Sequence, residues 1–364
     1  MPVATLLYVS AQPTSVGHTY RVTNHAERLR ELGYRVLVMP PEGATAAIRA
    51  LPRLRAVIVF RPVLDQAFQE WRQISRQRDL PLLVDLDDLT FDPALLEGGG
   101  WSYWRGLDHA QRQSWRQRVE AQRQALLASD GAIVSTSVLA GEVRQLGRPA
   151  WIWPNGFGDL SWATAAAARR RRQEAPQDPI VIGYASGTPT HANDFGEIAL
   201  ALAEILRRHA AVQLHVVGAL DLQRWSCLQE FSERLVNRPL VPYPQLPAEV
   251  SRFSINLAPL EINSRFCQAK SELKFFEAAA VGVPSVVTAT QPFAAVVQHR
   301  GNGCLARSAA EWVSALDWLV TDSDARRRLA RRAWRTVRRR FSPGAQRRDL
   351  RQLIEQGLFP ASPS

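Results

Sequence analysis

The chain has 364 residues, enough for about two domains of ordinary size. Its composition of 46% apolar, 22% charged and 8% aromatic residues is that of a globular protein and excludes a disordered or fibrous chain. No uninterrupted apolar stretch reaches the roughly 18 residues of a membrane-spanning helix, and the net charge of +11 favours polyanions such as nucleotides, acidic lipid surfaces or nucleic acid as partners.

The first residues and the cysteines indicate the compartment. The segment from Met1 to Ser10 carries no basic residue, so we expect a first β-strand there and no signal peptide. The cysteines Cys227, Cys267 and Cys304 are odd in number and have no neighbouring histidines of metal-site spacing. This pattern predicts neither a disulfide framework nor a zinc site, and it fits a reducing cytoplasm.

Short apolar runs alternate with helical patterns through the first half of the chain. The first helical pattern ends at Leu32, and Gly33 follows it as a C-cap. Runs that lie roughly 10 to 20 residues apart indicate right-handed crossovers between parallel strands. We therefore predict a Rossmann-like domain over residues 1–159, with strands at residues 6–10, 34–39, 56–60, 81–85, 132–135 and 150–153.

Turn residues and a charge run separate the two halves of the chain. The turn Pro154-Asn155-Gly156 precedes an alanine-rich stretch that ends in the run Arg169 to Arg172. Such a sequence is typical of an interdomain connection, so we predict a linker over residues 160–179. We expect its four arginines to be solvated, and a phosphate-binding role is the alternative.

The strand pattern resumes in the second half, with predicted strands at residues 178–186, 213–217, 255–258 and 285–288. We predict a second Rossmann-like domain over residues 180–340, followed by a helix and tail over residues 341–364 that could cross back to the first domain. The region from Glu311 onward has a helical, arginine-rich pattern. The predicted fold class is therefore α/β, with two doubly wound domains and parallel sheets.

The two lysines of the chain are close together. Among 45 basic residues only Lys270 and Lys274 are lysine, which suggests a site that needs a compact ammonium group. If a helix begins near Ser271, then Lys270, Lys274 and Glu277 fall along one helical stripe. Helix N-termini and ammonium groups favour a phosphate, and Glu277 could accept the hydroxyls of a ribose. The alternative is an exposed helix with an ordinary Lys274–Glu277 ion pair.

The run from Glu277 to Pro284, with the lysines before it, resembles the donor-binding segment of retaining family 4 glycosyltransferases (glycosyl transferases group 1), which have the GT-B fold. Further segments agree with this resemblance, at residues 130–137, 154–156, 183–188 and 301–303. It implies two Rossmann-like domains that face a cleft. The second would hold a UDP- or GDP-sugar as cosubstrate, and the first would hold the acceptor, with no further cofactor and no metal.

The chain departs from the family's pattern at two places. The first of the family's paired glutamates is replaced by Ala269, whereas the second matches Glu277. The loop at residues 186–194 has no arginine or lysine where the family usually grips the diphosphate. We therefore expect Lys270 and Lys274 to neutralise the diphosphate, helped by His191.

Three further residues are expected to contact the donor, and one pair of residues has an alternative role. Gly187 and Thr188 would add backbone contacts, and Ser271 would bind the donor at the start of the predicted helix. His191 and Asp194 resemble a His-x-x-Asp pattern of close relatives. A loop hydrogen bond without any part in catalysis is the alternative for this pair.

Two segments of the first domain could reach the reacting groups. Asp87 and Asp88 follow the strand at residues 81–85, and we expect an acceptor contact or general base there. A cap on the next helix and a Mg²⁺ or Mn²⁺ site are the alternatives. Gly17 and Arg21 lie at the first strand-to-helix turn, where the resemblance places a loop close to the phosphates.

The segment from Gly100 to Gly106, with Trp115 and Arg116 after it, combines tryptophan with arginine, a composition suited to lipid headgroups or to sugar stacking. Buried aromatic residues would give the same pattern. A peripheral contact with the inner face of the cell membrane therefore stays open.

The prediction is a cytoplasmic, metal-independent, retaining hexosyltransferase with a glycan, lipid-linked or protein acceptor. A degenerate GT-B binding protein and a nucleotide-sugar epimerase are the alternatives. A nucleic-acid binder has little support, because the arginines are scattered along the chain and no recognition module occurs.

Overall fold

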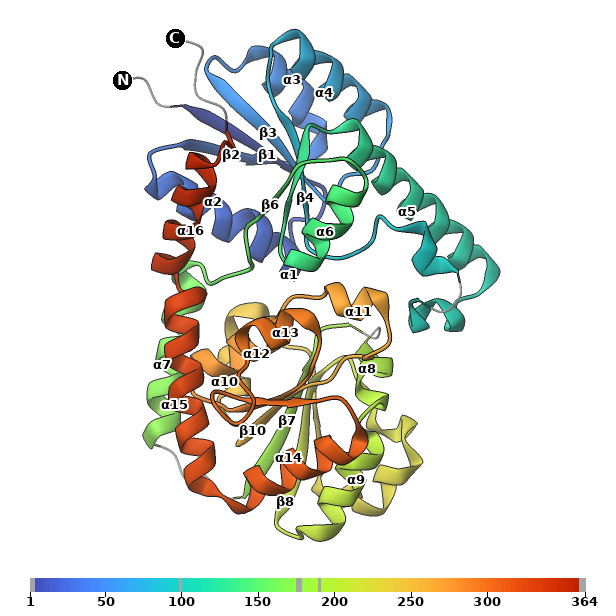
Figure 1. Cartoon of the computed structure of the whole chain (residues 1–364), viewed down its shortest axis with the longest axis vertical. Coiled ribbons are helices and arrows are strands. Elements are labelled where there is room, and N and C mark those ends of the chain that lie inside the picture. The colour runs from blue at the N-terminus through green and yellow to red at the C-terminus, as the bar shows by residue number, and fades with distance from the viewer. Residues whose placement is uncertain (1–3, 98–99, 175–178, 189–190, 360–364) are drawn as a thin grey trace. The chain divides into compact units, whose positions relative to one another are not determined.

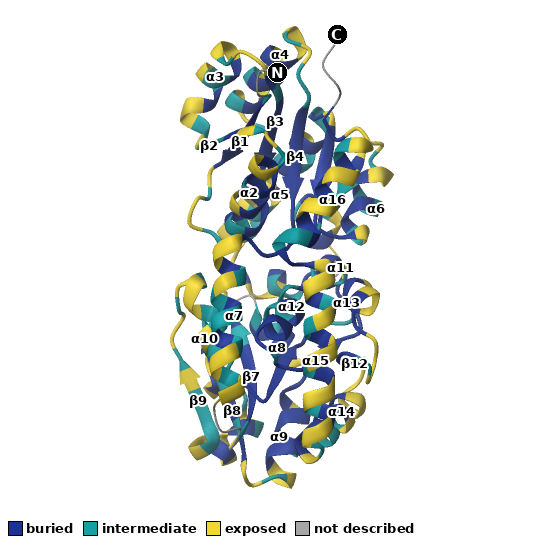
Figure 2. Ribbon diagram, turned by 90° about the vertical axis from the view of Figure 1, so that its left-hand side faces the viewer, coloured by how far each residue is buried: buried dark blue, intermediate teal, exposed yellow. Residues whose placement is uncertain are grey.

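The computed structural model describes residues 4–97, 100–174, 179–188 and 191–359. The chain divides into two compact units. Unit 1 comprises Met1–Asp159, Ala269–Ser271 and Phe341–Ser364, and unit 2 comprises Leu160–Gln268 and Glu272–Arg340. Both units are α/β structures in which helices flank a parallel sheet (Figure 1), and the buried residues concentrate in the strands (Figure 2).

The sheet of unit 1 has six parallel strands in the order β2-β1-β3-β4-β5-β6. All six predicted strands are confirmed. The inner strands β1, β3, β4 and β5 are apolar runs buried on both faces, as a parallel sheet requires, whereas the edge strands β2 and β6 are only partly buried. The strands are β1 (Thr5–Ser10), β2 (Arg35–Met39), β3 (Leu54–Phe60), β4 (Leu82–Leu86), β5 (Gly131–Val134) and β6 (Ala150–Ile152).

The helices of unit 1 have clear local signals. Gly33 adopts φ +90° directly after the first long helix, the left-handed conformation that a C-cap glycine supplies. Asp108 and Gln111 form a capping box at the start of α5. The helical segments are α1 (Val16–His18), the π-helical η1 (Thr19–Thr23), α2 (Asn24–Glu31), α3 (Pro41–Ala50), α4 (Gln66–Gln77), η2 (Pro93–Leu96), η3 (Ser102–Gly106), α5 (His109–Ala128), α6 (Ser137–Gln145) and α16 (Pro343–Glu355).

The C-terminal segment contributes to the core of unit 1. Leu350 and Leu353 of α16, with Leu358 and Phe359 after it, belong to the same buried cluster as the strands β1 and β3. The helix α16 packs on α2. Residues far apart in the sequence therefore close this core together.

The sheet of unit 2 also has six parallel strands, in the order β12-β11-β10-β7-β8-β9. The structure confirms the four predicted strands and adds β9 and β12. These two were missed because they are short edge strands, and β9 is only partly buried. The strands are β7 (Ile180–Ser186), β8 (Val212–Gly218), β9 (Leu235–Arg238), β10 (Ile255–Ala258), β11 (Ser285–Thr288) and β12 (Cys304–Ala306).

Helices of unit 2 include the arginine-rich C-terminal region that the sequence predicts. The helical segments are α7 (Asp159–Glu174), α8 (Ala192–Gly196), α9 (Ala199–Arg208), η5 (Leu222–Arg224), η6 (Ser226–Arg234), η7 (Tyr243–Gln245), α10 (Leu246–Val250), α11 (Arg265–Ala269), α12 (Leu273–Ala280), α13 (Gln291–Val296), α14 (Ala309–Thr321) and α15 (Ser323–Arg340). None of the described helices combines the length and the apolar character that crossing a bilayer would require.

The segment predicted as a linker forms most of α7, and its arginines divide between solvent and protein. Arg170 and Arg171 are exposed, as predicted. Arg172 is half-buried and donates to the carbonyl oxygens of Ser251 (2.6 Å) and Gly282 (3.2 Å). The prediction that all four arginines are solvated is therefore wrong for Arg172, which fixes α7 to the turn that follows α12.

The strand order of each sheet reverses once. In unit 1 the reversal lies between β1 and β3, and in unit 2 it lies between β7 and β10. In open parallel sheets, ligands bind beyond the carboxyl ends of the strands at such a switch point. These two places are therefore the first candidates for functional sites.

Candidate functional site

The switch point of unit 2 gathers polar side chains from three elements. His191 and Asp194 follow β7, Glu261 follows β10, and Lys274 lies in the first turn of α12. The predicted candidates His191 and Lys274 therefore meet beyond the carboxyl ends of two neighbouring strands. We call His191, Asp194, Glu261, Cys267 and Lys274 the β7–β10 site.

Lys274 is half-buried and held in place by its surroundings. Its Nζ lies 3.4 Å from Nδ1 of His191 and 5.5 Å from the centre of the Tyr184 ring. Because an ammonium group only donates, Nδ1 of His191 is the acceptor in this contact. The backbone is fixed as well, since Nδ2 of Asn256 in β10 donates to the carbonyl oxygen of Lys274 (3.2 Å). The site thus presents a fixed positive charge at the N-terminal end of α12.

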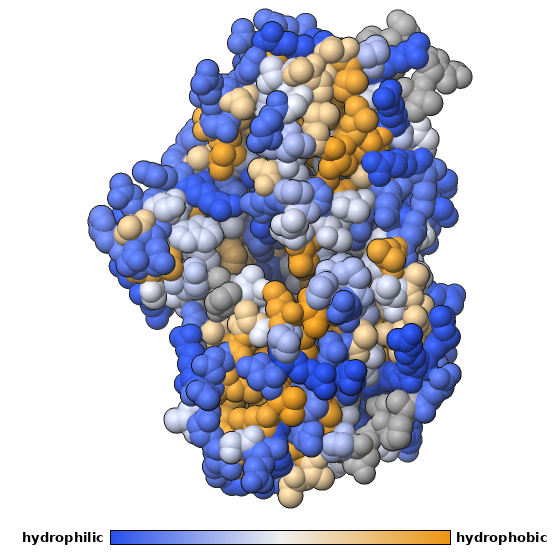
Figure 3. Space-filling model, turned by 180° about the vertical axis from the view of Figure 1, so that it is seen from behind, coloured by the Kyte–Doolittle hydropathy of each residue, from blue (hydrophilic) through white to orange (hydrophobic). Residues whose placement is uncertain are grey.

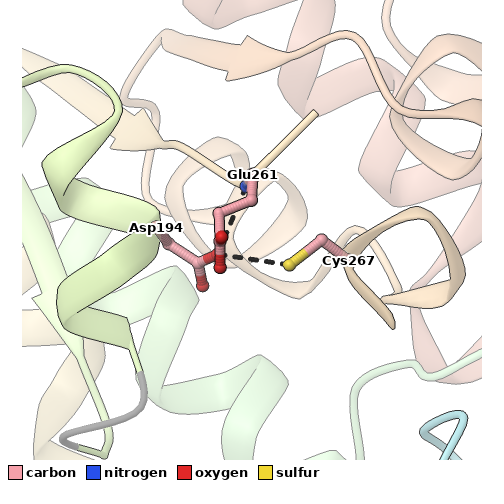
Figure 4. A group of neighbouring side chains, drawn as sticks. All are labelled: Asp194, Glu261 and Cys267. Atoms are coloured by element: carbon pink, nitrogen blue, oxygen red, sulfur yellow. Dashed lines mark hydrogen bonds between the residues drawn. The ribbon is translucent and has the colours of Figure 1, made fainter. Parts of the chain in front are cut away.

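The side chains of Asp194, Glu261 and Cys267 form a compact group in the same site (Figure 4). The Cys267 thiol donates to Oδ1 of Asp194 (3.3 Å), which also accepts from the backbone N–H of Glu261 (3.4 Å). The carboxylates of Asp194 and Glu261 and the Cys267 sulfur lie within 4.8 Å of one another. Asp194 is only 2% exposed. Its two hydrogen bonds join α8 to the loop after β10 and to α11, so Asp194 makes the loop hydrogen bond that is the alternative for the pair His191 and Asp194.

The buried hydroxyl of Tyr184 interacts electrostatically with Asp194 of this group. It has no hydrogen-bond partner among the described residues. Burial raises its pKa, and the nearby charge of Asp194 raises it further. The hydroxyl therefore stays protonated and leaves the negative charge of the site to the carboxylates.

The two lysines do not share a helical stripe. The predicted helix begins at Leu273, after Lys270, so helical spacing does not apply to Lys270. The segment Ala269–Ser271 groups with unit 1, where Thr136 Oγ1 donates to the carbonyl oxygen of Ala269 (3.1 Å). The prediction of one stripe is therefore wrong, and the two ammonium groups belong to different surroundings.

Ser271 also has its partner in unit 1. Nδ2 of Asn155 donates to its Oγ (2.9 Å). The predicted turn Pro154-Asn155-Gly156 thus supplies a side chain that fixes this segment, a role that the turn pattern alone does not reveal. Glu277 lies one helical turn after Lys274 and is half-buried. Donor contacts of Ser271 and Glu277 stay predictions.

The loop after β7 uses backbone groups of Thr188. Its carbonyl oxygen accepts from the backbone N–H of His191 (3.2 Å) and from Oγ of Ser186 (3.3 Å). Gly187 is exposed, with open space around the position of a Cβ atom. Residues 189–190 of this loop lie outside the described residues. Donor contacts of Gly187 and Thr188 stay predictions.

The switch point of unit 1 holds an ion-pair cluster formed by Arg61, Asp87 and Asp88, which we call the Arg61 cluster. Arg61 follows β3 and binds Asp87 with two hydrogen bonds, of 2.6 Å and 2.8 Å, and Asp88 with one of 3.0 Å. Arg61 adopts φ +46°, a conformation that costs a non-glycine residue energy. Arg61 is not among the residues predicted for this site, although its place at the carboxyl end of a strand is a usable signal.

Gly17 packs directly on this cluster. A Cβ atom there would lie 2.9 Å from Oδ2 of Asp87 and 3.1 Å from Cζ of Phe60. Only glycine therefore allows α1 to approach the cluster so closely. The predicted contact of Gly17 with a phosphate stays a prediction.

The neighbouring charges shift the pKa of Asp88 in opposite directions. Burial and the neighbouring Asp87 raise its pKa, whereas Arg61 and Lys270 lower it. Among the described residues, the next helical segment after Asp88 starts at Pro93 and has Asp92 as its N-cap. The alternative that Asp87 or Asp88 caps the next helix is therefore wrong.

Arg21 is a structural residue. Its side chain is completely buried and binds Asp85 with hydrogen bonds of 2.7 Å and 3.3 Å. It also donates to the carbonyl oxygen of Trp153 (2.6 Å). The prediction that Arg21 reaches a donor phosphate is therefore wrong, because no part of its guanidinium meets solvent.

His25 stacks on the Trp153 ring beside this ion pair, with ring centres 3.4 Å apart. Burial lowers the pKa of His25 to about 4, and the charge of Arg21 lowers it as well. The imidazole is therefore neutral at pH 7.

The tryptophan-rich segment of unit 1 is mostly packed against protein. Trp101 and Trp104 are 7% and 8% exposed, and Trp115 meets Trp101 edge-on with ring centres 4.9 Å apart. The guanidinium groups of Arg112 and Arg116 lie over the Trp104 ring. This arrangement agrees with the alternative of buried aromatic residues. None of the three cysteines, all of which lie in the described residues, forms a disulfide bond.

Comparisons with known proteins agree with this architecture. Residues 198–353 match the family model described as glycosyl transferase-like. No curated protein sequence matches the chain. Among solved structures, HepE of Anabaena in complex with UDP and glucose has a TM-score of 0.63 at 14% identity, with 97% of this chain and 100% of that one covered.

Two further solved structures are similar over nearly the whole chain. Sucrose-phosphate synthase from Thermosynechococcus elongatus has a TM-score of 0.65 at 17% identity, with 97% and 98% covered. A glycosyltransferase from Rickettsia africae has a TM-score of 0.68 at 10% identity, with 99% and 100% covered. At such identities the likeness establishes the fold.

The class of protein follows from these findings. The chain has the GT-B fold, with two Rossmann-like units that each carry a six-stranded parallel sheet. Its residues 198–353 match the glycosyl transferase-like family model, which agrees with the resemblance to group 1 glycosyltransferases.

Proposed function

We propose that this protein transfers a sugar from a UDP-sugar to a hydroxyl acceptor with retention of configuration. The observation that carries the proposal is the fixed pair of Lys274 and His191 at the switch point of unit 2, with Nζ and Nδ1 3.4 Å apart. UDP is preferred to GDP as the nucleotide because structurally similar HepE was crystallised with UDP and with UDP-glucose.

In this proposal the donor binds at the β7–β10 site. When the bond between C1 of the sugar and the diphosphate oxygen breaks, its electron pair passes to the diphosphate. The Lys274 ammonium and the N–H groups at the start of α12 stabilise that charge. His191 accepts from Lys274 and keeps the ammonium directed. Glu277, one turn further along α12, accepts the hydroxyl groups of the ribose.

We assign the acceptor to the Arg61 cluster. Both carboxylate oxygens of Asp87 already bind Arg61, so Asp88 is the better candidate to take the proton of the acceptor hydroxyl. The hydroxyl oxygen forms the new bond to C1 on the face that the leaving diphosphate vacates, which retains the configuration. The charge of Lys270 lowers the pKa of Asp88 and so helps to keep this carboxyl ionised, as a general base requires.

The positive charge of Lys274 at the start of α12 supports a reaction without a divalent metal. Lys274 and the helix N-terminus supply the charge that a metal ion would otherwise bring to the diphosphate. We therefore expect turnover to persist in the presence of EDTA.

A thermal-shift measurement followed by a transfer assay tests the proposal. Binding to the folded state alone raises the melting temperature, so UDP should raise it more than GDP or ADP does. The protein is then incubated with a panel of UDP-sugars and hydroxyl acceptors, and the anomeric configuration of any product is read by NMR. The proposal would be abandoned if none of the three nucleotides shifted the melting temperature.

A second candidate is a binding protein that has kept the fold without turnover. Ala269 favours it, because this position lacks the first glutamate of the family pattern and the residue is fully buried. Donor binding without transfer or hydrolysis would support this second candidate. Conversion of the bound nucleotide sugar to a different sugar, without transfer, would instead indicate an epimerase.

A further inference from the structure

One helix holds most of the net charge of this chain. The helix α15 contains nine arginines and a single acidic residue, Asp324, which gives it a net charge of +8 against +11 for the whole chain. Its buried spine of Ala325, Leu329, Ala333 and Val337 faces the core of unit 2. Charge is therefore concentrated on one surface element, and the expectation from the sequence that the arginines are scattered is wrong for this helix.

The arginines of α15 form a stripe on its outer side. At 100° per residue, seven of them fall within an arc of about 140° that is turned away from the buried spine. From Arg327 to Arg339 this stripe extends over about 18 Å. We call it the α15 stripe, and its members are all exposed: Arg327, Arg328, Arg331, Arg332, Arg335, Arg338 and Arg339.

Few carboxylates neutralise the stripe. Arg327 pairs with Asp324 and Arg328 lies 3.6 Å from Asp322, both at its first turn. In the part of the chain that the structure describes, no carboxylate pairs with Arg331, Arg332 or Arg335. The middle of the stripe therefore presents several neighbouring guanidinium groups to the solvent.

The helix α7 adds an uncharged strip on the same side of unit 2 (Figure 2). The two helices meet where the guanidinium of Arg169 lies over the Trp334 ring, 4.3 Å from its centre. On α7, Leu160 is 65% exposed, and Ala163 and Ala167 lie on the same helical face before Arg170 and Arg171. Figure 3 shows this change from apolar to strongly hydrophilic side chains along α7.

We propose that the surface formed by α7 and the α15 stripe binds the headgroup layer of a membrane rich in anionic lipids. Phosphate groups of lipids complement a row of guanidinium groups, and each basic side chain near such a layer strengthens binding. The exposed Leu160 and the alanines of α7 suit the boundary between headgroups and acyl chains. Nucleic acid is the less suitable polyanion, because Trp334, the tryptophan of α15, is covered by Arg169 and Arg338 and cannot stack on a base.

This surface is distinct from the tryptophan-rich segment of unit 1, where the sequence first suggests a membrane contact. Trp101 and Trp104 are buried and Trp115 is half-buried, whereas the α15 stripe is exposed. The inference also does not depend on the proposed transferase activity, because none of the arginines in the stripe belongs to the β7–β10 site.

Vesicle flotation of the full chain tests the inference. We expect the protein to float with vesicles of phosphatidylglycerol and phosphatidylcholine in a one-to-one ratio and not with phosphatidylcholine alone. Binding should weaken steeply between about 0.1 M and about 1 M salt, since the Debye length falls from about 10 Å to about 3 Å. Equal binding to both vesicle types would overturn the inference.

Variants with reversed charge test whether the α15 stripe is the surface that binds the vesicles. The triple variant Arg331→Glu, Arg332→Glu, Arg335→Glu should partition at least about 100-fold more weakly, from about fivefold for each arginine lost. The matched control Arg105→Glu, Arg116→Glu, Arg123→Glu changes the charge equally in unit 1 and should bind like the wild type.

Further measurements keep the test decisive. If the glutamate variant does not fold, glutamine at the same three positions is used, with melting curves as the check. Unchanged vesicle binding by a folded stripe variant, or tighter binding of the wild type to a short RNA or DNA duplex at equal salt, would refute the inference. Both variants should keep the thermal response to UDP, so failure here is distinguishable from failure of the transferase proposal.

Discussion

Replacing Glu272 with glutamine tests the electrostatics at the start of α12. Glu272 is the N-cap residue of this helix and is only 8% exposed. Burial raises the pKa of its carboxyl to about 7, although its own backbone N–H and the charge of Arg340 oppose the shift. An ordinary glutamate in the unfolded chain ionises with a pKa near about 4.3.

The sign of the pH effect follows from linkage. Between pH 4.5 and 7 the folded protein keeps a proton on Glu272 that the unfolded chain has lost. The free energy of unfolding therefore falls as the pH rises through this window and is constant above it. From pH 5 to pH 8 the loss spans about two pKa units at about 1.36 kcal/mol each, which is about 3 kcal/mol.

Glutamine carries no titrating proton, so Glu272→Gln removes this loss. The difference in the free energy of unfolding between variant and wild type should be about 3 kcal/mol more favourable to the variant at pH 8 than at pH 5. Urea denaturation at the two pH values measures it. The exposed Glu311, in the first turn of α14, offers the matched control Glu311→Gln, which should give similar differences at both.

The ionisation of Glu272 should also weaken the binding of the donor. Above pH 7 the ionised Glu272 places a negative charge at the helix end that we assign to the diphosphate. UDP affinity of the wild type should therefore fall from pH 6 to pH 8, and the affinity of Glu272→Gln should change less. If the free energies of unfolding of Glu272→Gln and the wild type differed by the same amount at pH 5 and at pH 8, this reasoning would be refuted.

Three further predictions concern other charged groups. Lys274→Ala should weaken UDP binding about 10- to 100-fold, as the loss of a charge-assisted hydrogen bond implies, whereas Lys270→Ala should lower kcat with UDP binding retained; calorimetry and initial rates separate them. Wild-type stability should fall by about 3 kcal/mol between pH 6.5 and pH 4, because the unfolded chain protonates His25 and the folded one does not, and His25→Phe should remove much of this acid-dependent loss in urea melts. Arg61→Met removes a charge that lowers the pKa of Asp88, so the acidic limb of the pH–rate profile should move to higher pH; an unmoved limb would exclude Asp88 as the base.

Most of the fold could be predicted because its signals are local. The apolar runs that became β1, β3 and β5 are continuous and flanked by turn residues, as buried parallel strands require. Gly33 marks a helix end because only glycine readily adopts its positive φ. The strands β9 and β12 escaped prediction because edge strands need fewer apolar residues.

The partners of charged residues could not be predicted, because they are distant in the sequence. Arg21 lies in η1, the helical segment after β1, and is fully buried against Asp85, 64 residues away. Arg61 directly follows β3 and reaches Asp87 and Asp88 at a partly exposed position. The residues next to either arginine do not reveal these partners, since burial depends on which strands become neighbours.

The lysine spacing was misleading for a related reason. Four residues separate Lys270 from Lys274, which suits a helix, but the helix begins only at Leu273. The chain before it is held by Asn155 and Thr136 in unit 1. Tertiary hydrogen bonds therefore override the local helical pattern.

The path of the chain has a consequence for synthesis. The core of unit 1 includes Leu350, Leu353, Leu358 and Phe359, and the chain passes through all of unit 2 before it reaches them. While the ribosome is still translating α15, the first 159 residues have an unfinished hydrophobic cluster. The core of unit 1 therefore cannot be completed until the last helix has been synthesised. A protein truncated before α16 would expose apolar core residues of unit 1 to chaperones and proteases.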